Sequence, residues 1–308
     1  MDEMELMMHL HRNNKRQGPG SEDATNLAVT LAKIDREKSY KIADIGCGTG
    51  EQTISLAKML KGNIIAVDLF EEFLEKLKED SKNENITAHI ETLAASMDKL
   101  PFEKEEFDII WSEGAVYNIG FKNGINYWKE FLKPGGILAV SELSWITNCR
   151  PKELEDFWNG EYAEMDTIAG KIKALEEAGY KVLGHFILPD DCWLDNYYNP
   201  LLDSHKDFME KFGDNEVARV IVERDIQEAD FYKKYKDYYS YGFYIALKSA
   251  TKLFSVLLAS KRPLITELAD KLRLKYPLLP TISPCPTMRL EAIRSIIPIS
   301  CRRYPKSV

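Results

Sequence analysis

The sequence predicts an α/β fold: a doubly wound, mostly parallel sheet of seven strands with a helical cap and a C-terminal extension. From residue 41 to residue 248, short and nearly continuous apolar runs alternate with stretches whose apolar residues recur at helical spacing. Such strands, separated by amphipathic helices, indicate a parallel sheet that is covered on both faces. The first strand also leads directly into a glycine-rich loop and a helix, which places a tight turn at the edge of that sheet.

The first four strands are predicted at residues 41–45, 63–67, 86–90 and 107–111. Amphipathic helices separate the first three of these strands. The chain therefore begins as strand–helix–strand units, which favour parallel pairing. The apolar positions that mark the two helices are Ile54, Leu56, Ala57 and Leu60 in one, and Phe70, Phe73, Leu74 and Leu77 in the other.

The second half continues the alternation with one interruption. A helix with apolar residues at 125, 128, 131 and 132 is predicted to stop at 133–136 (KPGG), where proline and glycine enforce a turn. The remaining strands are predicted at 137–140, 180–188 and 241–247. Residues 188–239 are rich in aromatic and acidic side chains and are predicted to form a mostly helical cap.

Residues 1–249 are predicted to form one domain. It consists of an N-terminal cap (1–40), a cofactor-binding half (41–148) and a substrate-side half with the last strand (149–249). Residues 250–308 differ in kind, because they hold seven of the 13 prolines and have room for one helix, at about 264–276. We interpret them as a basic, proline-rich extension that is either partly disordered or foreign to the domain.

Composition and charge exclude several classes of protein. No uncharged apolar run approaches the roughly 18 residues of a membrane helix, and the N-terminus is acidic where a signal peptide would be basic. The five cysteines are odd in number and widely spaced, so no metal site is expected and reduced thiols in the cytoplasm are the plain interpretation. The residues before Lys252 include 30 basic and 46 acidic ones, and this negative charge argues against a nucleic-acid substrate.

The strongest local pattern is the loop after the first strand. Asp44, Gly46, Gly48 and Gly50 fall between a strand and a helix, where glycine permits a sharp turn and lets a ligand approach the main chain. Asp68 ends the next strand, 18 residues beyond Gly50, and a carboxylate there accepts hydrogen bonds from both hydroxyls of a ribose. The plainer alternative is a tight turn together with an acid that caps a helix.

The spacing of the glycines separates two classes of nucleoside ligand. A dinucleotide fingerprint reads GxGxxG and places a pyrophosphate at the helix N-terminus. Here the position of its last glycine is Glu51, whose carboxylate would repel a pyrophosphate, so NAD and FAD are disfavoured. The observed spacing, GxGxG after Asp44, resembles the first motif of the class I S-adenosylmethionine (SAM) dependent methyltransferases, and Asp68 matches the ribose-binding acid of that family.

Further segments strengthen this resemblance. Residues 96–102 resemble the segment that holds the adenine, 107–114 resemble the fourth-strand motif beside the methionine part of SAM, and 132–136 resemble the turn before strand five. We expect residues around Arg16 to fold over the cofactor, with Arg16 either pairing with its carboxylate or solvated at the surface. The cofactor-binding residues that the resemblance implies are Arg16, Gln17, Gly18, Asp44, Gly46, Cys47, Gly48, Gly50, Asp68, Leu69, Ser96, Met97, Asp98, Ser112 and Glu113.

A looser resemblance extends over more of the chain. Residues 15–21, 112–120 and 186–189 look like a bacterial subgroup similar to the ubiquinone and menaquinone methyltransferases (methyltransferase type 11). The resemblance implies a Rossmann-like fold, SAM as cofactor, and a small-molecule acceptor bound by a monomer or homodimer, without nucleic acid or membrane. The alternatives that stay open are an RNA or protein methyltransferase and a non-catalytic SAM-binding protein.

Methyl transfer from a sulfonium is an in-line displacement, which needs a general base only if the nucleophile must lose a proton. No catalytic residue is therefore assigned, and the candidates are Glu113, Tyr117 and Glu142. Substrate contacts are expected from Tyr117, Glu142 and Trp145, which follow strands four and five at the edge where α/β sheets bind ligands. Alternatively, Glu113 caps a helix and Trp145 packs in a lid.

Two further groups of side chains have competing interpretations. The aromatic residues between Trp158 and Tyr244 either wall an apolar substrate pocket or pack the helical cap. Among the histidines, His89 and His185 are expected in the core, and His9 and His11 are expected in solvent.

Overall fold

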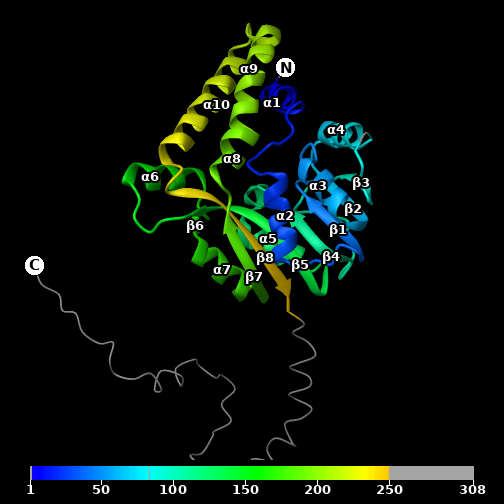
Figure 1. Cartoon of the computed structure of the whole chain (residues 1–308). Helices are drawn as coiled ribbons and strands as arrows, with labels where there is room; N and C mark the ends of the chain where they lie inside the picture. Colours follow the sequence, from blue (N-terminus) through cyan, green and yellow to red (C-terminus); the bar gives the residue numbers. More distant parts are fainter. Residues whose placement is uncertain (1, 83, 250–308) are drawn as a thin grey trace, which may run out of the picture. The chain divides into compact units, whose positions relative to one another are not determined.

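The computed structural model describes residues 2–82 and 84–249 of the chain. These residues form an α/β fold in which helices lie on both faces of one sheet, as Figure 1 shows. The predicted extension at 250–308, including its helix at about 264–276, lies outside the described residues, so it stays a prediction.

The sheet confirms the predicted doubly wound, mostly parallel arrangement. Its strands follow the order β3-β2-β1-β4-β5-β8-β7, and β8 runs antiparallel to both of its neighbours while the other pairs along this path are parallel. A two-residue strand, β6, pairs with the end of β5 and has no counterpart in the sequence prediction. The strands are β1 (Ser39–Ile45), β2 (Lys61–Asp68), β3 (Ala88–Ala94), β4 (Phe107–Ser112), β5 (Leu132–Trp145), β6 (Asp166–Thr167), β7 (Tyr180–Ile187) and β8 (Tyr239–Lys248).

The central strands determine where a ligand belongs. The chain runs outward from β1 to β2 and β3, and then returns to place β4 on the other side of β1. Asp44 of β1 lies opposite Trp111 of β4 in this parallel pair. The strand order therefore reverses between β1 and β4, and open α/β sheets bind their ligands at the carboxyl ends of the strands at such a point.

Two apolar clusters hold the helices to the sheet. Helices α2 and α3 pack with Ile42 and Trp111, while α5 and α7 pack with Ile110 and Val140. Neighbouring residues of β4 belong to different clusters because successive side chains of a strand point to opposite faces. The helices of these layers are α2 (Glu22–Leu31), α3 (Glu51–Met59), α4 (Glu71–Ser81), which covers β2 and β3, α5 (Phe121–Trp128) and α7 (Ile168–Glu177).

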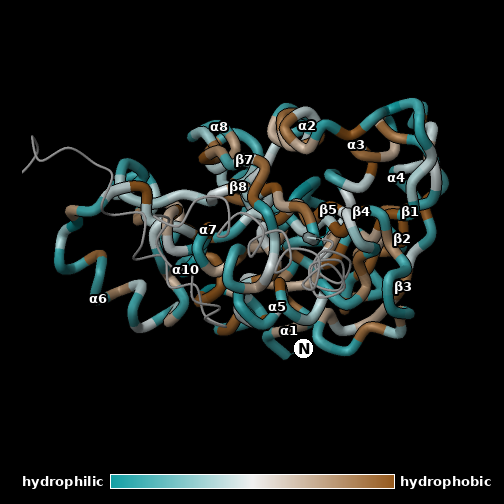
Figure 2. Tube along the Cα trace, turned by 90° about the horizontal axis from the view of Figure 1, so that it is seen from below, coloured by the Kyte–Doolittle hydropathy of each residue, from teal (hydrophilic) through white to brown (hydrophobic). Residues whose placement is uncertain are grey.

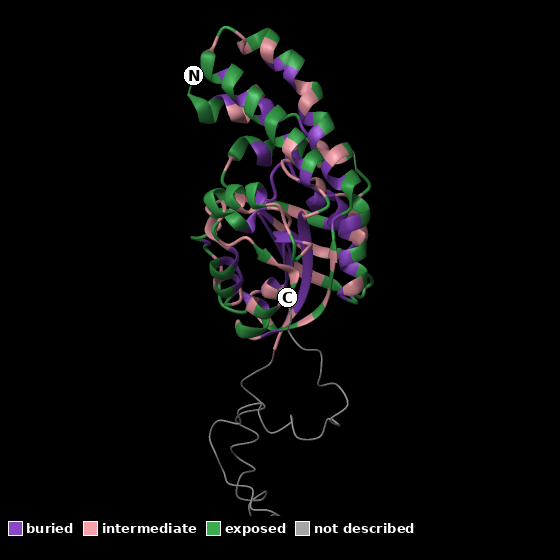
Figure 3. Cartoon of the chain, turned by 90° about the vertical axis from the view of Figure 1, so that its left-hand side faces the viewer, coloured by how far each residue is buried: buried purple, intermediate pink, exposed green. Residues whose placement is uncertain are grey.

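Burial and hydropathy follow this layering. In Figure 3 the strands are largely purple, and exposed green residues lie along the outer surfaces of the helices. In Figure 2 apolar brown stretches gather where the strands run through the centre of the molecule. The sheet is therefore the middle of the hydrophobic core, as the near-continuous apolar strands predict.

The turn before β5 differs from the prediction. Helix α5 ends at Trp128, and β5 begins at Leu132, which already pairs with Phe107. Pairing resumes only between Ile109 and Ile137, so residues 133–136 form an irregularity inside the strand pair. Proline and a left-handed Gly135 (φ +78°) disturb the ladder without ending the strand, because β4 pairs with β5 on both sides of the turn, at Leu132 and again from Ile137.

The predicted helical cap is confirmed. Helix α8 (Asp190–Trp193) continues through a π-helical turn, η2 (Leu194–Tyr198), into α9 (Asn199–Phe212), and α10 (Glu216–Tyr235) runs back to the sheet. Figure 1 shows α9 and α10 side by side with α1 (Glu3–His11) beside them. An apolar cluster joins the three helices: Leu6, Leu10, Leu201, Phe208, Ala218 and Ile221. A further helix, α6 (Lys152–Glu161), follows β5.

Three of the histidine predictions are wrong. His11 is only 8% exposed, because α1 packs against α9 and α10, whereas His9 is exposed as predicted. His89 and His185 are exposed although they lie in strands. Both belong to the outermost strands, β3 and β7, where helices do not cover every side chain.

Candidate active site

The glycine loop between β1 and α3 lies against two other parts of the chain. A Cβ on Gly46, whose φ is +74°, would lie 2.4 Å from the Cβ of Ala115 in the loop after β4. A Cβ on Gly48 would lie 2.3 Å from Oε1 of Gln17. Any side chain at these two positions would therefore push apart the elements that meet at the carboxyl end of β1.

Asp68 is fixed at the end of β2 by the glycine loop. Its Oδ2 accepts a hydrogen bond of 2.8 Å from the N–H of Gly48, and its Oδ1 accepts one of 3.0 Å from the N–H of Phe70. Burial raises the pKa of this carboxyl. Each oxygen keeps a second lone pair, so the carboxylate remains able to accept bonds from ribose hydroxyls.

Three acidic side chains, those of Asp44, Asp68 and Glu113, lie close enough around this loop for their charges to interact. Asp44 is buried, its Oδ2 accepts a 2.5 Å hydrogen bond from Oγ1 of Thr53, and its Oδ1 has no partner among the described residues. Burial, helped by the charges of Glu113 and Asp68 and opposed by the Thr53 bond, raises the pKa of Asp44 to about 7. A site of this kind stabilises a positively charged ligand and repels a pyrophosphate.

Arg16 and Glu113 meet beside this loop and are both buried. Nη1 of Arg16 lies 3.1 Å from Oε2 of Glu113, with side-chain exposures of 5% and 4%. Glu113 also accepts bonds from Oγ1 of Thr25 at 2.7 Å and from Nε1 of Trp111 at 2.9 Å. These partners replace the helix-capping alternative for Glu113, and the solvated alternative for Arg16 is wrong. Nη2 of Arg16 has no hydrogen-bond partner in the described chain, so it is free to bind an anion such as a carboxylate.

The segment around Gln17 is tied to the glycine loop. Oε1 of Gln17 accepts a 2.8 Å bond from the N–H of Thr49, and Nε2 donates to the carbonyls of His11 and Asn14. Oγ1 of Thr49 donates to the carbonyl of Lys15 at 2.9 Å. No atom lies within 4 Å of the Cβ position of Gly18, which therefore leaves open space behind Gln17.

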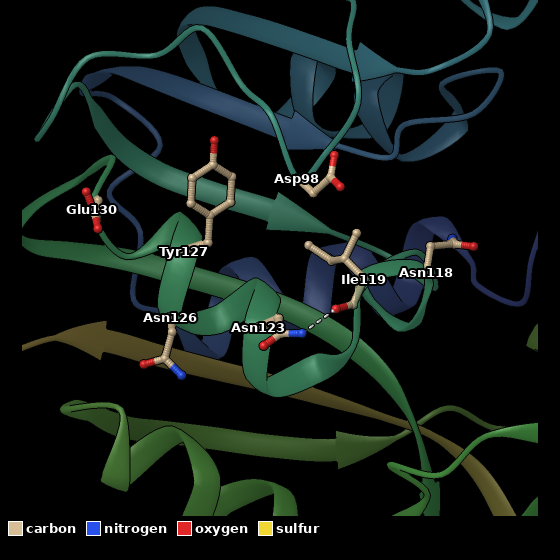
Figure 4. Close-up of a pocket in the computed structure, with 7 residues that line it drawn as sticks. All are labelled: Asp98, Asn118, Ile119, Asn123, Asn126, Tyr127 and Glu130. Carbon is tan, nitrogen blue, oxygen red and sulfur yellow. Dashed lines mark hydrogen bonds between the residues drawn. The ribbon is translucent and has the colours of Figure 1, made fainter.

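The segment after β3 contributes the residues expected near an adenine. Leu69, after β2, is 62% exposed, and the carbonyl of Met97 accepts a 2.9 Å bond from Nε1 of Trp128. Oγ of Ser96 donates to Oδ1 of Asp98 at 2.5 Å. Figure 4 shows Asp98 at one side of an open hollow of about 620 Å³ above α5. Its lining residues are Asp98, Asn118, Ile119, Asn123, Asn126, Tyr127 and Glu130.

Two of the expected cofactor residues are buried in the frame of the site. Burial raises the pKa of the Cys47 thiol well above its usual value, so this sulfur is inert packing in the loop. Oγ of Ser112 donates a 2.8 Å bond to the carbonyl of Ile45. This bond joins the last residues of β4 and β1 at the point where the strand order reverses.

The side of the site away from the loop holds a buried ion pair that the sequence does not reveal. Oε1 of Glu142 lies 3.0 Å from Nζ of Lys171, with side-chain exposures of 0% and 3%. Nζ also donates to the carbonyl of Glu164 at 2.8 Å and lies over the rings of Phe121 and Tyr162. Oε2 of Glu142 has no hydrogen bond within the described residues. Burial raises the pKa of Glu142 although Lys171 opposes this shift.

The other two expected substrate residues differ in exposure. Tyr117 lies in the 3-10 helix η1 (Val116–Ile119) and is 45% exposed, with its ring edge-on to that of Tyr162. Trp145 is 5% exposed in the main hydrophobic cluster, with the Arg150 guanidinium 4.5 Å from its ring centre. These surroundings favour the alternative in which Trp145 packs against neighbouring side chains over the one in which it contacts the substrate.

Comparisons with known proteins agree with this geometry. A family described as "Methyltransferase domain" matches residues 42–136, from β1 into β5. A demethylmenaquinone methyltransferase of Staphylococcus saprophyticus is 30% identical over 174 residues, covering 55% of this chain and 72% of that protein. The ubiquinone/menaquinone biosynthesis C-methyltransferase UbiE of Pseudomonas entomophila is 27% identical over 150 residues, covering 48% of this chain and 57% of that protein. The chain thus matches about half the length of several curated relatives, including 47% of the Francisella philomiragia protein.

Solved structures share the fold at low sequence identity. A SAM-dependent methyltransferase from Geobacter sulfurreducens, solved with S-adenosyl-L-homocysteine, superposes with a TM-score of 0.69 at 14% identity and covers 79% of this chain and 98% of its own. A protein of E. coli superposes with a TM-score of 0.67 at 18% identity, covering 79% and 99%. These likenesses concern the fold.

Fold and site together define a Rossmann-like protein in which the glycine loop and Asp68 meet at the carboxyl ends of β1 and β2. The chain belongs to the class I SAM-dependent methyltransferases, and SAM is its cofactor. Within residues 2–82 and 84–249, every helix is too short or too polar to cross a membrane.

Proposed function

We propose that this protein transfers the methyl group of SAM to a small-molecule acceptor, and that it does so in the cytoplasm as a monomer or homodimer. One observation carries the proposal: the glycine loop touches the exit of β4, where Ala115 would meet a Cβ of Gly46 at 2.4 Å. The side chains expected to contact the acceptor follow β4 and β5 at the same edge of the sheet. Cofactor and acceptor therefore have adjacent places, as direct transfer requires.

The chain's own groups fit SAM. The unpartnered Nη2 of Arg16 suits the methionine carboxylate, and the unpartnered Oδ1 of Asp44 suits a cationic group. Asp68 suits the ribose hydroxyls, and the segment of Met97 and Asp98 suits the adenine. When bound, SAM supplies a methyl group on a positively charged sulfur, which is an electrophile without further activation.

The task of the remaining residues is to position the acceptor and exclude water. Glu113 is unsuited as a base, because its carboxylate is buried and already accepts bonds from three side chains. Burial raises the pKa of Tyr117, so its hydroxyl stays protonated at neutral pH and acts as a hydrogen-bond donor. Alignment and desolvation are thus the main sources of rate enhancement that we propose.

The alternatives of RNA and protein methylation have less support. The acidic excess in the residues before Lys252 opposes the approach of a polyanion, and the acids around the glycine loop add to it. A non-catalytic SAM-binding role remains the third alternative, because a binding loop alone does not establish turnover.

Two measurements test the proposal. Calorimetry should detect SAM or its demethylated product and no NAD, and NAD binding without SAM binding would contradict it. Radioactive methyl transfer should label a metabolite extract and leave bulk RNA and protein unlabelled. Labelled polymer would favour the alternative substrates, and no label in any fraction would favour a binding protein. If Tyr117→Phe and Glu142→Gln both leave turnover unchanged, neither residue is a base.

A further inference from the structure

One carboxylate of the cap, that of Glu228, forms no ion pair within the described residues. Glu228 lies on α10, and its Oε1 accepts a 3.0 Å hydrogen bond from the hydroxyl of Tyr198. Oε2 makes no hydrogen bond to any described residue, and no Lys or Arg of the described chain forms an ion pair with Glu228. The nearest candidate on the same helix, Arg224, pairs instead with Glu3 at 3.1 Å. Glu228 therefore lacks a direct ion-pair partner, and the charge of Arg224 offsets its negative charge only from a distance.

Aromatic rings lead from Glu228 to the methyl-transfer site. The ring of Tyr198 lies 4.8 Å from that of Tyr197 and 6.1 Å from that of Trp193. Trp193 stacks on Tyr241 of β8, with 5.1 Å between ring centres and 15° between planes. The hydroxyl of Tyr241 lies 3.7 Å from the Cβ position of Gly114, in the loop after β4. A chain of packed aromatic rings, most of them buried, thus connects the cap acid with the exit of β4.

The backbone at this place is irregular. Tyr197 and Tyr198 lie in the π-helical turn η2, where the N–H of Asn199 bonds to the carbonyl of Leu194. A π-turn widens the helix by one residue and is frequently found at functional sites, because it turns side chains out of the regular helical positions. Here it occurs at the residues that contact Glu228.

The charges of Glu228 and Glu142 act on the same two tyrosines. The charges of both acids raise the pKa of Tyr117 and of Tyr241, in addition to the larger effect of burial. The hydroxyls of Tyr241 and Tyr197 have no hydrogen-bond partner within residues 2–82 and 84–249. Because Lys171 neutralises Glu142, the remaining charge that acts on these tyrosines is that of Glu228.

We propose that Glu228, with the rings of Tyr117, Tyr197 and Tyr241, binds a protonated amino group of the acceptor, so that the protein is an amine N-methyltransferase. This inference rests on the proposed methyl transfer to a small molecule and names the class of that molecule. A carboxylate with tyrosine faces is the environment that attracts an ammonium ion, through charge and through cation–π contact.

The step balances as follows. The ammonium nitrogen gives one proton to Glu228, which frees its lone pair. The lone pair forms the N–C bond to the transferred methyl, the S–C bond breaks, and its electron pair stays on sulfur. The products are an N-methylated ammonium ion and S-adenosylhomocysteine, and Glu228 returns its proton to water. Burial raises the pKa of Glu228, which suits it to hold that proton briefly.

Choline and 3,3-dimethylbutan-1-ol test the binding site, because they share a shape and differ in charge. Titration of each into the full chain loaded with S-adenosylhomocysteine, followed by NMR, should show saturable binding of choline and binding of the alcohol at least about tenfold weaker. The substitution Glu228→Gln should weaken the binding of choline by about tenfold or more. Glu223→Gln, an exposed acid on the same helix, should leave it unchanged. Equal affinity for both probes, absent choline binding, or an unchanged Glu228→Gln variant would overturn the inference.

A second experiment separates this inference from the proposed function. A metabolite extract is divided by cation exchange, and each fraction is incubated with the enzyme and radioactive SAM. We expect the label in the cationic fraction, as an N-methylated amine. Label only in the neutral and anionic fractions would overturn the amine inference and leave the proposed function standing. If no fraction is labelled, both the amine inference and the proposed function are overturned.

Discussion

Arg16 and Glu113 form a buried ion pair, with 3.1 Å between Nη1 and Oε2, across 97 residues of sequence. The pair joins the N-terminal segment to the exit of β4. Glu113 also accepts bonds from Thr25 of α2 and Trp111 of β4. One carboxylate therefore links α2, β4 and the segment around Arg16 that precedes α2. The contact fixes Arg16 next to Gln17, which is bonded to Thr49 of the glycine loop, so the N-terminal segment is held against that loop.

Replacing Arg16 by alanine should lower the free energy of unfolding by about 3 kcal/mol, because the buried charge of Glu113 loses its cation. Urea unfolding measures this loss. Arg12→Ala is the matched control, since Arg12 is exposed and 3.9 Å from Glu75, and it should change stability by less than about 1 kcal/mol. Equal effects of the two variants would show that the buried pair adds no stability.

Asp68→Ala should weaken SAM binding by about 2 kcal/mol, the scale of charge-assisted hydrogen bonds to the ribose. The fold should survive, because Asp68 is the last residue of β2. Calorimetry with SAM measures the effect, and Glu91→Ala, an exposed acid on β3, serves as control. An unchanged dissociation constant would mean that the ribose is held elsewhere.

Asp44 should make stability depend on pH. Its pKa is about 7 in the folded chain against an ordinary value of 3.8, so the folded state binds the extra proton between these values. The contribution is complete below about pH 4 and is lost as pH rises through 7, by up to about 4 kcal/mol at about 1.4 kcal/mol per pH unit. Urea unfolding between pH 4 and 8 should show a flatter slope for Asp44→Asn. Parallel slopes would contradict the raised pKa.

Lys171→Met should lower the free energy of unfolding by about 3 kcal/mol at pH 8, because Glu142 then carries a buried and unpaired charge. The loss should shrink toward pH 5, since burial raises the pKa of Glu142 and the acid takes up a proton instead. Lys173→Met is the control on the same helix, because its pair with Glu177 is exposed. A loss that does not vary with pH would argue that Lys171 acts through packing alone.

A chain that ends after Ser249 should fold and bind SAM as the full chain does. The last strand of the described residues, β8, ends at Lys248 and fills the place between β5 and β7 in the sheet. Thermal melting and SAM calorimetry compare the two chains. Insolubility, or a melting temperature several degrees lower, would place part of residues 250–308 in the core.

The sequence by itself determines seven of the eight described strands, the glycine loop and the acid at the end of β2. These features are local: apolar periodicity belongs to one strand or helix, and Gly46, Gly48 and Asp68 belong to one strand–helix–strand unit. The mostly helical cap also follows from its sequence, although its contacts do not. The turn at 133–136 is visible too, but the sequence does not show that β5 continues through it, because that depends on its neighbours β4 and β8.

Only the tertiary structure decides which distant side chains meet. An arginine such as Arg16 is expected at the surface from its charge. Its burial depends on the ion pair with Glu113, and no local sequence pattern connects the two residues. Lys171 is one of two lysines on an amphipathic helix, and the sequence does not distinguish it until β5 places Glu142 beside it. Glu228 and Tyr241 lie on elements whose spacing indicates packing alone. Tyr241 reaches Gly114 after β4 because β8 returns to the sheet beside β5, and Glu228 meets Tyr198 because α10 packs on the cap. The free-energy cost of burying a charge depends on the partners that the fold places beside it. The sequence therefore predicts the glycine loop, whereas the tertiary structure decides which charged groups surround it.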